Sequence, residues 1–305
     1  MRTAALADLV EEWVPLAPRS TYKMGGQARY FCEASDEQKL LRLAGILAEG
    51  EIPLLVLGRG SNLVISDAGF PGLVVRLGAH FAEVGVEPDG TVSAGGSTSL
   101  AILARTASQA GRGGLEFFVA IPGSVGGAVR MNAGCHGTET TERLRLARVV
   151  SLSTGEVTHR DPAGLELGYR SSNLQPWEVV TRAWFLSRPQ PPEESSRLIR
   201  EVTRWRRDHQ PGGTLNAGSV FRNPPGDVAG RLIDELGLKG MRVGSASVSQ
   251  KHANFFVAEP GASAQDVYDL VWAVRRRVRE ETGIWLEPEV QFAGPFRPSP
   301  DEGSP

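Results

Sequence analysis

The sequence contains only two cysteines among its 305 residues. Cys32 and Cys135 are far apart and show no CxxC spacing, which excludes a zinc site built from cysteines alone and argues against a disulfide framework. Cys135 stands beside His136 in a glycine-rich segment, but no activating pattern accompanies the pair. We therefore expect neither a nucleophilic cysteine nor a metal site.

The sequence also lacks an excess of charge of one sign. Lysine and arginine total 33 against 35 acidic residues, which gives a formal net charge of −2. Binding to nucleic acid depends on clustered positive charge, so this balance argues against a nucleic-acid partner. Two short basic runs, 204–207 and 275–277, lie on helical patterns, and a solvated helix face is the simpler interpretation of both.

Long hydrophobic runs are missing as well. No apolar run reaches the roughly 20 residues that a membrane-spanning helix needs. The N-terminus shows no basic region followed by an apolar core, as a signal peptide would. We therefore expect a cytoplasmic protein with no membrane partner. A hydrophobic content of 41% and this length suit two or three globular domains.

Hydrophobic periodicity predicts short strands that alternate with helices over the first two thirds of the chain. Strands are expected at 52–57, 73–77, 84–86, 149–152 and 179–185, and helices at 36–49 and 99–110. After a proline-rich stretch at 189–194, helices are expected at 195–207, 227–236 and 263–281, the last opened by a capping box at 263–266, with a strand at 253–257. We place a domain boundary near residue 188, between domains of 20–188 and 189–294, and expect a disordered tail at 295–305.

Two glycine-rich segments are the first sign of a ligand. The first, 58–63, follows a predicted strand directly, and glycines let backbone N–H groups approach a phosphate closely. It lacks the third glycine of the dinucleotide fingerprint and the lysine of a P-loop. A tight turn between strands explains this segment alone equally well.

The second segment, 121–134, carries four glycines and would bind a ligand through N–H donors without supplying an acid, base or nucleophile. Two such segments in one strand-rich domain suggest a bound dinucleotide. The expected contact residues are Gly58, Arg59, Gly60, Ser61, Asn62, Leu63, Ile121, Pro122, Gly123, Ser124, Gly126, Gly127, Asn132, Ala133 and Gly134.

The segment 216–224 carries Ser219 between small residues, with Arg222 and Asn223 close behind. Pro224 ends whatever extended segment precedes it, because proline cannot donate to a sheet ladder. Taken alone, the segment is explained equally well as a strand followed by a turn and as part of an active site. Its significance comes from two other segments, 169–172 and 286–290.

Together these segments resemble the UDP-N-acetylenolpyruvoylglucosamine reductases. The segments 58–63, 121–134, 169–172, 217–224 and 286–289 occur in that family's order, 21–26 is similar to its opening segment, and the similarity runs from about residue 20 to residue 294. The resemblance implies an α+β fold, with an FAD-binding domain of the PCMH (vanillyl-alcohol-oxidase-like) type followed by a smaller α+β substrate-binding domain.

The resemblance also implies an activity. Non-covalently bound FAD would accept electrons from NADPH and reduce UDP-N-acetyl-enolpyruvoylglucosamine to UDP-N-acetylmuramate, a peptidoglycan precursor. No tyrosine lies between Arg170 and Ser219, so the chain looks like the family's second type, which lacks a tyrosine-bearing loop. Contacts to the substrate diphosphate would then fall to other groups, and we name Asn223, His252, Lys251 and His209 as candidates, although a structural role is the commoner one for a residue such as His252.

Three residues carry the implied chemistry. Ser219 would protonate the carbanion that forms beside the substrate carboxylate, a step that depends on position more than on acidity. Arg170 cannot act as an acid, because guanidinium stays protonated, and would hold the carboxylate instead. Glu289 would have to be protonated or hydrogen-bonded to avoid opposing the developing negative charge. Without the resemblance, a surface arginine and a solvated carboxylate would explain Arg170 and Glu289.

Two other functions remain open at this point. One is a flavin oxidase with the same FAD-binding architecture, although the segment 58–63 has no histidine that could tether the flavin. The other is a non-catalytic sensor of a uridine nucleotide, which would need no proton donor at Ser219.

Overall fold

The protein is described here by a computed structural model, in which residues 6, 8–47 and 52–302 are described. The chain forms two compact units, each assembled from several segments. The first unit comprises 1–12, 30–59 and 72–206, and the second comprises 13–29, 60–71 and 207–305. The border between them falls within the strands β1 (Glu11–Pro15), β2 (Gln27–Ala34) and β5 (Phe70–Leu77).

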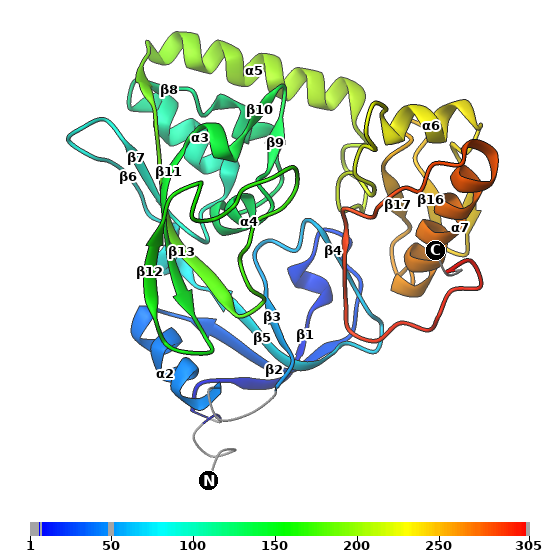
Figure 1. Ribbon diagram of the computed structural model, residues 1–305, viewed down its shortest axis with the longest axis horizontal. Coiled ribbons are helices and arrows are strands. Elements are labelled where there is room, and N and C mark those ends of the chain that lie inside the picture. Colours follow the sequence, from blue (N-terminus) through cyan, green and yellow to red (C-terminus); the bar gives the residue numbers. More distant parts are fainter. Residues whose placement is uncertain (1–5, 7, 48–51, 303–305) are drawn as a thin grey trace. The chain divides into compact units, whose positions relative to one another are not determined.

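A four-stranded sheet has the order β1–β2–β5–β3, in which β3 (Leu54–Val56) runs parallel to β5. The helix α2 (Glu37–Leu47), drawn in blue in Figure 1, is amphipathic. It buries Leu40 and Leu43 in one cluster with Leu73 and Val75 of β5. Leucines three residues apart on α2 therefore pack against alternate residues of β5 and form one small core.

The second sheet of the first unit is antiparallel, with the order β12–β11–β13–β7–β6. Its strands are β6 (Val84–Val86), β7 (Val92–Gly95), β11 (Leu144–Ser151), β12 (Val157–Arg160) and β13 (Glu178–Phe185). In Figure 1 they run from the green β11, β12 and β13 to the cyan β6 and β7. The helices α3 (Leu100–Gln109) and α4 (Val125–Arg130) bury their apolar faces in one cluster with Ala183 and Phe185 of β13.

Short elements complete the first unit. They are the pairs β8 (Arg112–Gly113) with β14 (Arg188–Pro189) and β9 (Gly134–Cys135) with β10 (Thr138–Glu139), and the 3-10 turns η2 (Ala79–Ala82), η3 (Glu116–Ala120) and η4 (Thr140–Glu142). The helix α5 (Pro192–His209) packs Ile199 and Val202 against the same cluster as α3 and α4.

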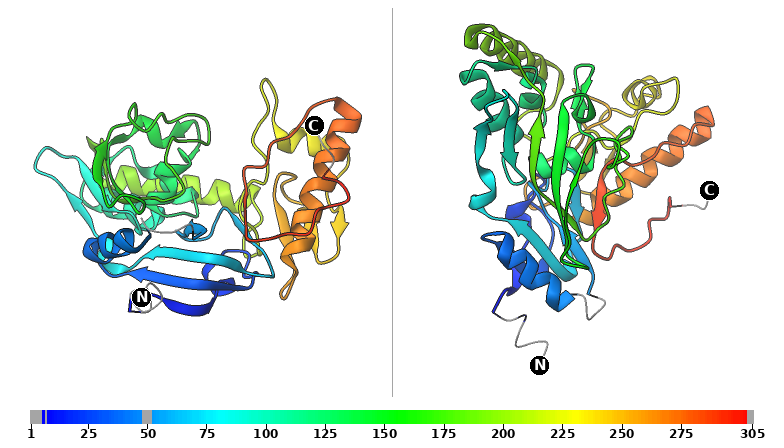
Figure 2. Two further views of the ribbon diagram at one scale, coloured as in Figure 1. Left: turned by 60° about the horizontal axis from the view of Figure 1, so that its bottom comes forward. Right: turned by 60° about the vertical axis from the view of Figure 1, so that its left-hand side comes forward.

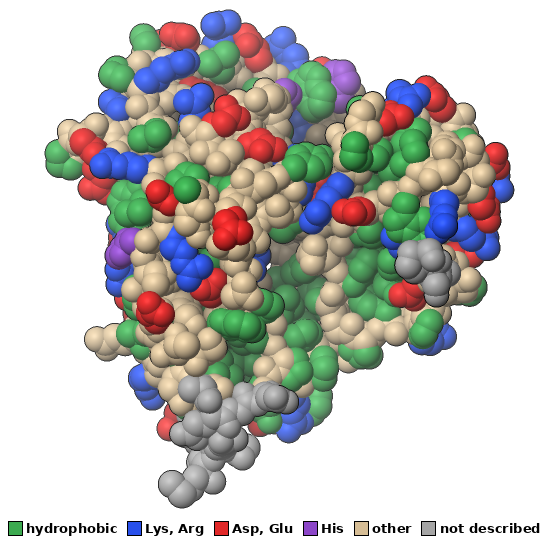
Figure 3. Space-filling view, in the orientation of Figure 1, with side chains coloured by type: hydrophobic (Ala, Val, Ile, Leu, Met, Phe, Trp, Pro, Cys, Tyr) green, Lys and Arg blue, Asp and Glu red, His purple; other side chains and the backbone are tan. Residues whose placement is uncertain are grey.

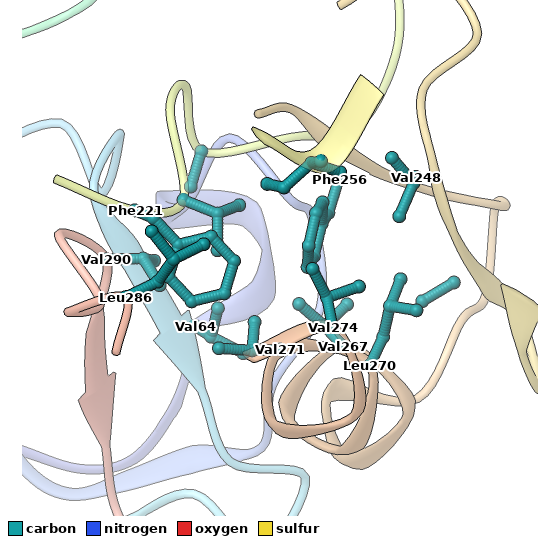
Figure 4. Close-up of a cluster of buried hydrophobic side chains, with 14 of the residues drawn as sticks. Val64, Phe221, Val248, Phe256, Val267, Leu270, Val271, Val274, Leu286 and Val290 are labelled. Atoms are coloured by element: carbon teal, nitrogen blue, oxygen red, sulfur yellow. The ribbon is translucent and has the colours of Figure 1, made fainter. Parts of the chain in front are cut away.

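The second unit is built around the helix α7 (Ala264–Thr282), the long orange helix in both views of Figure 2. It also contains η1 (Ala17–Arg19), α6 (Ala229–Glu235), the parallel pair β4 (Leu63–Ile65) and β18 (Gln291–Ala293), and a sheet of β15 (Arg242–Val243), β16 (Ala246–Val248) and β17 (Phe256–Ala258). Figure 4 shows Val267, Leu270, Val271 and Val274 of α7 facing Phe221 and Phe256. Tyr22, Met24 and Val64 belong to the same cluster.

The start of α7 differs in part from the predicted capping box. Ser263 does cap the helix, since its Oγ accepts the N–H of Gln265 at 3.1 Å. Asp266, however, accepts from the N–H and the hydroxyl of Ser245, at 2.8 and 2.6 Å. Asp67 provides the further cap, because its carboxylate accepts the N–H of Ala264 at 3.0 Å.

The predicted disorder of the tail is wrong for residues 295–302. Phe296 stacks on Tyr268 with the ring centroids 4.7 Å apart, and the hydroxyl of Tyr268 donates to Glu302 at 2.7 Å. Arg276 pairs with Asp301 at 2.8 Å. Aromatic contacts with α7 therefore outweigh the Pro- and Ser-rich composition, while the predicted tail residues 303–305 lie outside the described part of the chain. The domain limits at 20–188 and 189–294 stay a prediction about ligand-binding roles.

Two surface properties bear on partners. Lys and Arg side chains are interspersed with Asp and Glu on the face shown in Figure 3. Within 6, 8–47 and 52–302, no helix combines the length and the apolar character that crossing a bilayer requires.

Candidate functional site

The first glycine-rich segment is a turn whose backbone donors point away from other protein groups. Among the described residues, the N–H groups of Gly58, Arg59, Gly60 and Ser61 have no hydrogen-bond acceptor. Gly60 has φ +60°, and a Cβ there would lie 2.5 Å from the carbonyl oxygen of Arg19. Four consecutive unpaired donors are what an anionic group such as a diphosphate needs.

The two glycine-rich segments meet at Gly58 and Ser124, which both belong to the first unit. A Cβ built on Gly58 would lie 2.6 Å from the Oγ of Ser124, which caps α4 by accepting the N–H of Gly127 at 3.3 Å. Beside them is a cavity of about 100 Å³. Its lining consists of Val56, Leu57, Gly58, Arg59, Arg76, Leu77, Gly96, Ser97, Ser124, Gly126, Gly127, Arg130, Glu178, Val179 and Val180.

The charges that line this cavity suit the phosphate-bearing part of FAD. Three guanidinium groups, those of Arg59, Arg76 and Arg130, line it, whereas its one carboxylate, Glu178, is already paired with Arg160. Burial lowers the pKa of Arg130, which donates to the carbonyl oxygens of Leu174, Gln175 and Glu178. The glycines leave the backbone accessible, and the arginines supply positive charge for a diphosphate.

The predicted contact residues separate into two groups. Gly58, Arg59, Ser124, Gly126 and Gly127 line the cavity, while the remaining ones do not. Sequence reasoning missed Arg76, Arg130, Ser97 and Glu178. A single arginine in a strand pattern gives no signal of its own, because alternation does not say which face of the sheet it occupies.

Both polar atoms of the Asn132 side-chain amide form hydrogen bonds with other groups of the protein. It is 1% exposed, its Oδ1 accepts the N–H of Thr141 at 2.8 Å, and its Nδ2 donates to Glu139 and to the carbonyl of Gly168, each at 2.9 Å. Both amide hydrogens are therefore used within the protein. Its side chain is therefore committed to protein groups, and its role as a flavin contact stays a prediction.

Arg170 lies at the tip of a narrow turn in the first unit. Gly168 and Ser171 exchange two backbone hydrogen bonds of 3.2 Å, and Arg170 has φ +54°. Its guanidinium donates to Glu139 at 3.3 Å and to the carbonyl of Gly134 at 3.2 Å, and lies 4.9 Å from the ring centroid of Tyr169. The side chain is 19% exposed, so it is held on the protein rather than extended into solvent.

Ser219 and Glu289 lie on neighbouring extended segments of the second unit. The carbonyl of Val220 accepts the N–H of Glu289 at 2.7 Å, and Ser219 forms an isolated bridge with Phe255 on its other side. Asn254 fixes the middle segment, because its side chain exchanges hydrogen bonds of 2.9 and 2.8 Å with the backbone of Phe221. Gly218 has φ +78°, which allows the tight turn just before Ser219.

The end of the first glycine-rich segment supports Glu289. The side-chain amide of Asn62 donates to the carbonyl of Glu289 at 3.0 Å, and the carbonyl of Asn62 accepts the N–H of Gln291 at 2.9 Å. Leu63 then opens β4, opposite Gln291 of β18. Asn62 and Leu63, predicted as flavin contacts, thus position a candidate catalytic segment.

The four candidate diphosphate ligands have different surroundings, all within the second unit. Asn223 accepts the N–H of Ala229 at 3.1 Å at the start of α6, and Lys251 donates to the carbonyl of Arg207 at 2.5 Å. His252 accepts the N–H of Asn254 at 3.2 Å, and burial, reinforced by the nearby Lys239, lowers its pKa. His209 is exposed near the end of α5. These contacts leave ligand binding by the four as a prediction.

Cys135 is a poor nucleophile in this setting. Burial raises its pKa to about 11, although Arg170 and Arg206 act in the opposite direction. Its thiol donates to the carbonyl of Phe117 at 3.1 Å. The thiolate fraction near neutral pH is therefore very small.

Comparison with known proteins agrees with this geometry. Residues 28–160 match a family model described as an FAD binding domain, and residues 210–293 match one described as the C-terminal domain of UDP-N-acetylenolpyruvoylglucosamine reductase. The predicted fold class is thereby confirmed.

Relatives of known structure or sequence extend the match over nearly the whole chain. The UDP-N-acetylenolpyruvoylglucosamine reductase 2 of Symbiobacterium thermophilum is 43% identical over 92% of this chain and 91% of its own length, and the reductase of a Synechococcus species is 39% identical over 96% and 94%. The crystal structure of the reductase from Thermus caldophilus superposes with a TM-score of 0.81 at 40% identity, covering 93% of this chain and 98% of that one. This protein therefore belongs to the family of UDP-N-acetylenolpyruvoylglucosamine reductases, which are flavin-dependent oxidoreductases.

Proposed function

We propose that this protein reduces UDP-N-acetyl-enolpyruvoylglucosamine to UDP-N-acetylmuramate with NADPH, as a cytoplasmic step in the synthesis of peptidoglycan precursors. The observation that carries the proposal is the backbone bond from Glu289 to Val220, which holds Ser219 and Glu289 on adjacent segments. A proton donor and a carboxyl group on adjacent segments suit reduction of a carbon–carbon double bond next to a carboxylate. The family membership supplies the substrate class.

FAD would be held by the turn 58–61 and the arginine-lined cavity of the first unit. When bound, FAD would supply the hydride-transfer chemistry between NADPH and the enolpyruvyl group. We infer that it is bound without a covalent link, since the segment 58–63 contains no histidine or cysteine to which it could be tethered.

The chain's own residues would handle the proton and the negative charge. Hydride addition leaves negative charge on the carbon next to the substrate carboxylate, and Ser219 would donate its hydroxyl proton there, to be replaced from solvent. Arg170 would bind the carboxylate and stabilise the negative charge as it develops. Glu289 would orient Ser219 and the substrate by hydrogen bonding.

The substrate diphosphate would be bound in the second unit. Asn223, Lys251, His252 and His209 are the proposed ligands. The segment between Arg170 and Ser219 contains β13, β14 and α5 but no tyrosine, which supports assignment to the second type of the family.

The first test is an anaerobic absorbance titration of the purified protein. Flavin bands at about 450 nm should bleach when NADPH is added and return when the enolpyruvyl nucleotide follows. A colourless protein that cannot be reconstituted with FAD would contradict the proposal. Return of the bands only with oxygen would instead indicate an oxidase.

The substitution Ser219→Ala separates the two half-reactions. We expect flavin reduction by NADPH to stay near the wild-type rate, while reoxidation by the enolpyruvyl nucleotide slows by about 100-fold or more, as expected for loss of one preorganised donor. Stopped-flow absorbance measures both rates. If both fell equally, Ser219 would be a structural residue and its assignment as proton donor would be wrong.

A further inference from the structure

The surroundings of Arg170 contain a carboxylate that neither the sequence motifs nor the comparisons single out. Glu139 ends β10 and caps the 3-10 turn η4. One of its oxygens accepts from Arg170 at 3.3 Å and the other accepts from Asn132 at 2.9 Å. The same carboxylate also accepts the backbone N–H of Glu142. It thus joins Arg170 to the second glycine-rich segment.

From these contacts we propose that Glu139 is a positioning residue for Arg170, which fixes the direction of the guanidinium and thereby the place where the substrate carboxylate is bound. The inference rests on the proposed function, in which Arg170 binds that carboxylate. Arg170 sits at the tip of a two-residue turn at φ +54°, so the turn alone leaves a long side chain free to rotate. Glu139 removes that freedom before substrate arrives.

Asn132 makes the arrangement rigid. Its amide donates to the Gly168 carbonyl, which closes the turn that carries Arg170, and to Glu139, which holds the Arg170 side chain. Asn132 has φ +40° and is 1% exposed, so this bracing group is itself fixed in the core. The buried amide of Asn132 therefore helps to position both the backbone of Arg170, through Gly168, and its side chain, through Glu139.

The same contacts explain why residue 134 is a glycine. It pairs with Glu139 across β9 and β10, and a Cβ at Gly134 would lie 2.7 Å from the Cγ of Glu139 and equally 2.7 Å from the carbonyl oxygen of Thr138. The carbonyl of Gly134 accepts the second contact from Arg170, at 3.2 Å. A side chain at residue 134 would therefore displace both the Glu139 side chain and the backbone of β10, whether or not a flavin lies nearby.

The chemistry at Glu139 requires a carboxylate. Glutamine at this position replaces one of the two acceptor oxygens by an NH2 group. Because Arg170 and Asn132 donate to different oxygens of Glu139, the amide oxygen can then accept from only one of them in this geometry. Aspartate keeps both acceptors on a side chain that is one methylene shorter. Glu139→Gln and Glu139→Asp therefore test charge and reach separately. Gly134→Ala displaces the Glu139 side chain without altering it, together with the neighbouring carbonyl of Thr138.

The experiment measures reoxidation of the NADPH-reduced holoenzyme by the enolpyruvyl nucleotide. We expect Glu139→Gln and Gly134→Ala to slow this step by about 10- to 100-fold, because small misplacement of a binding group has effects of this size. Glu139→Asp should lose less. Glu166, an exposed carboxylate four residues before Arg170, provides the matched control, and Glu166→Gln should change the rate by less than about threefold.

A double-mutant cycle decides whether Glu139 acts through Arg170. If it does, adding Glu139→Gln to Arg170→Gln causes no further loss, because the positioned group is already gone. Independent, multiplicative losses, or a wild-type rate for Glu139→Gln, would overturn the inference and leave the proposed function standing. A wild-type rate for Arg170→Gln would instead overturn the role of Arg170 in the proposed function. FAD content and melting temperature identify variants that fail to fold, and Glu139→Asp, which keeps both acceptors, then carries the test.

Discussion

Gly58 shows how one missing methyl group can decide cofactor binding. A Cβ there would meet the Oγ of Ser124 at 2.6 Å, which is closer than real atoms of this kind approach. The space between the two glycine-rich segments is therefore set by the absence of a side chain at residue 58 and by the helix-capping serine opposite.

We predict that Gly58→Ala weakens FAD binding by about 10- to 100-fold, the equivalent of roughly 1–3 kcal/mol of overpacking. Fluorescence titration of the apoprotein with FAD measures the effect. In the Ser124→Ala background the substitution should weaken binding far less, because the clashing oxygen is gone. An equal effect in both backgrounds would show that the Gly58–Ser124 contact is not the cause.

Gly45 is the control for this substitution. It is exposed on α2, and a Cβ there meets nothing within 4 Å. Gly45→Ala should leave FAD affinity unchanged and raise the free energy of unfolding by about 0.5–1 kcal/mol, since alanine favours a helix interior. Loss of FAD affinity in this variant would mean that alanine substitution acts on the whole unit.

At the scale of elements, an ion pair joins α2 to the antiparallel sheet. Arg148 of β11 donates to both oxygens of Glu37, at 2.8 and 2.7 Å, and the two side chains are 32% and 29% exposed. The Arg148 hydrogen bonds lower the pKa of Glu37 below its ordinary value, and its charge acts in the same direction. Because this pKa is lower in the folded state, the pair stabilises the protein above the unfolded pKa, and the contribution is lost as the pH falls through the folded pKa.

We therefore predict that Glu37→Gln lowers the free energy of unfolding by about 1–2 kcal/mol at pH 7 and by less near pH 3. Urea unfolding followed by circular dichroism at both pH values tests this. Glu201→Gln removes an exposed i, i+4 pair on α5, whose side chains are 60% and 53% exposed, and should have almost no effect at either pH. A loss for Glu37→Gln that is equal at both pH values would contradict the prediction.

The sequence predicts elements better than it predicts the grouping of residues around a ligand. The helices expected at 99–110 and 263–281 are α3 and α7, because apolar period and caps are local properties. The strand expected at 253–257 begins only at Phe256, since His252, Asn254 and their neighbours are held by a turn in which Phe255 donates to the carbonyl of His252. Secondary-structure propensity depends on the residue and its neighbours in sequence, so it does not predict such contacts.

The roles of the glycine-rich segments show the same limit. The sequence indicates that both bind a ligand, and Gly58, Arg59, Ser124, Gly126 and Gly127 do line one cavity. The sequence does not indicate that the Asn62 side chain donates to the backbone of Glu289, or that the side-chain amide of Asn132 is hydrogen-bonded within the protein. Those roles depend on partners 227 and 36 residues away in the chain, which no short motif contains.

At the scale of the whole molecule, the core of the second unit is not confined to the C-terminal residues 207–305. Its core includes Tyr22, Met24 and Val64, and the hydroxyl of Tyr22 donates to the carbonyl of Phe256 at 2.9 Å. Burial raises the pKa of Tyr22 strongly, which reflects how completely this ring is enclosed. The segment 207–305 alone would expose the surface that these side chains cover.

We predict that a fragment of residues 207–305 does not fold cooperatively, whereas co-expression with residues 1–206 yields a folded complex. The reason is the missing core residues and the missing partner β4 for β18. Circular dichroism and thermal unfolding of the purified fragment check the first part, and co-purification checks the second. A cooperative transition in the isolated fragment would show that the segments 13–29 and 60–71 are dispensable for this core.

The interleaving of the two units also sets an order of events on the ribosome. All segments of the first unit have been made once residue 206 is synthesised. Val64, in contrast, packs in a core with Phe221, Leu286 and Val290, which are synthesised much later. At about 5–20 residues per second this delay lasts on the order of 10–45 seconds. During translation, the apolar side chains of 13–29 and 60–71 are therefore without their final partners. These two short stretches are where a nascent chain would need a chaperone most.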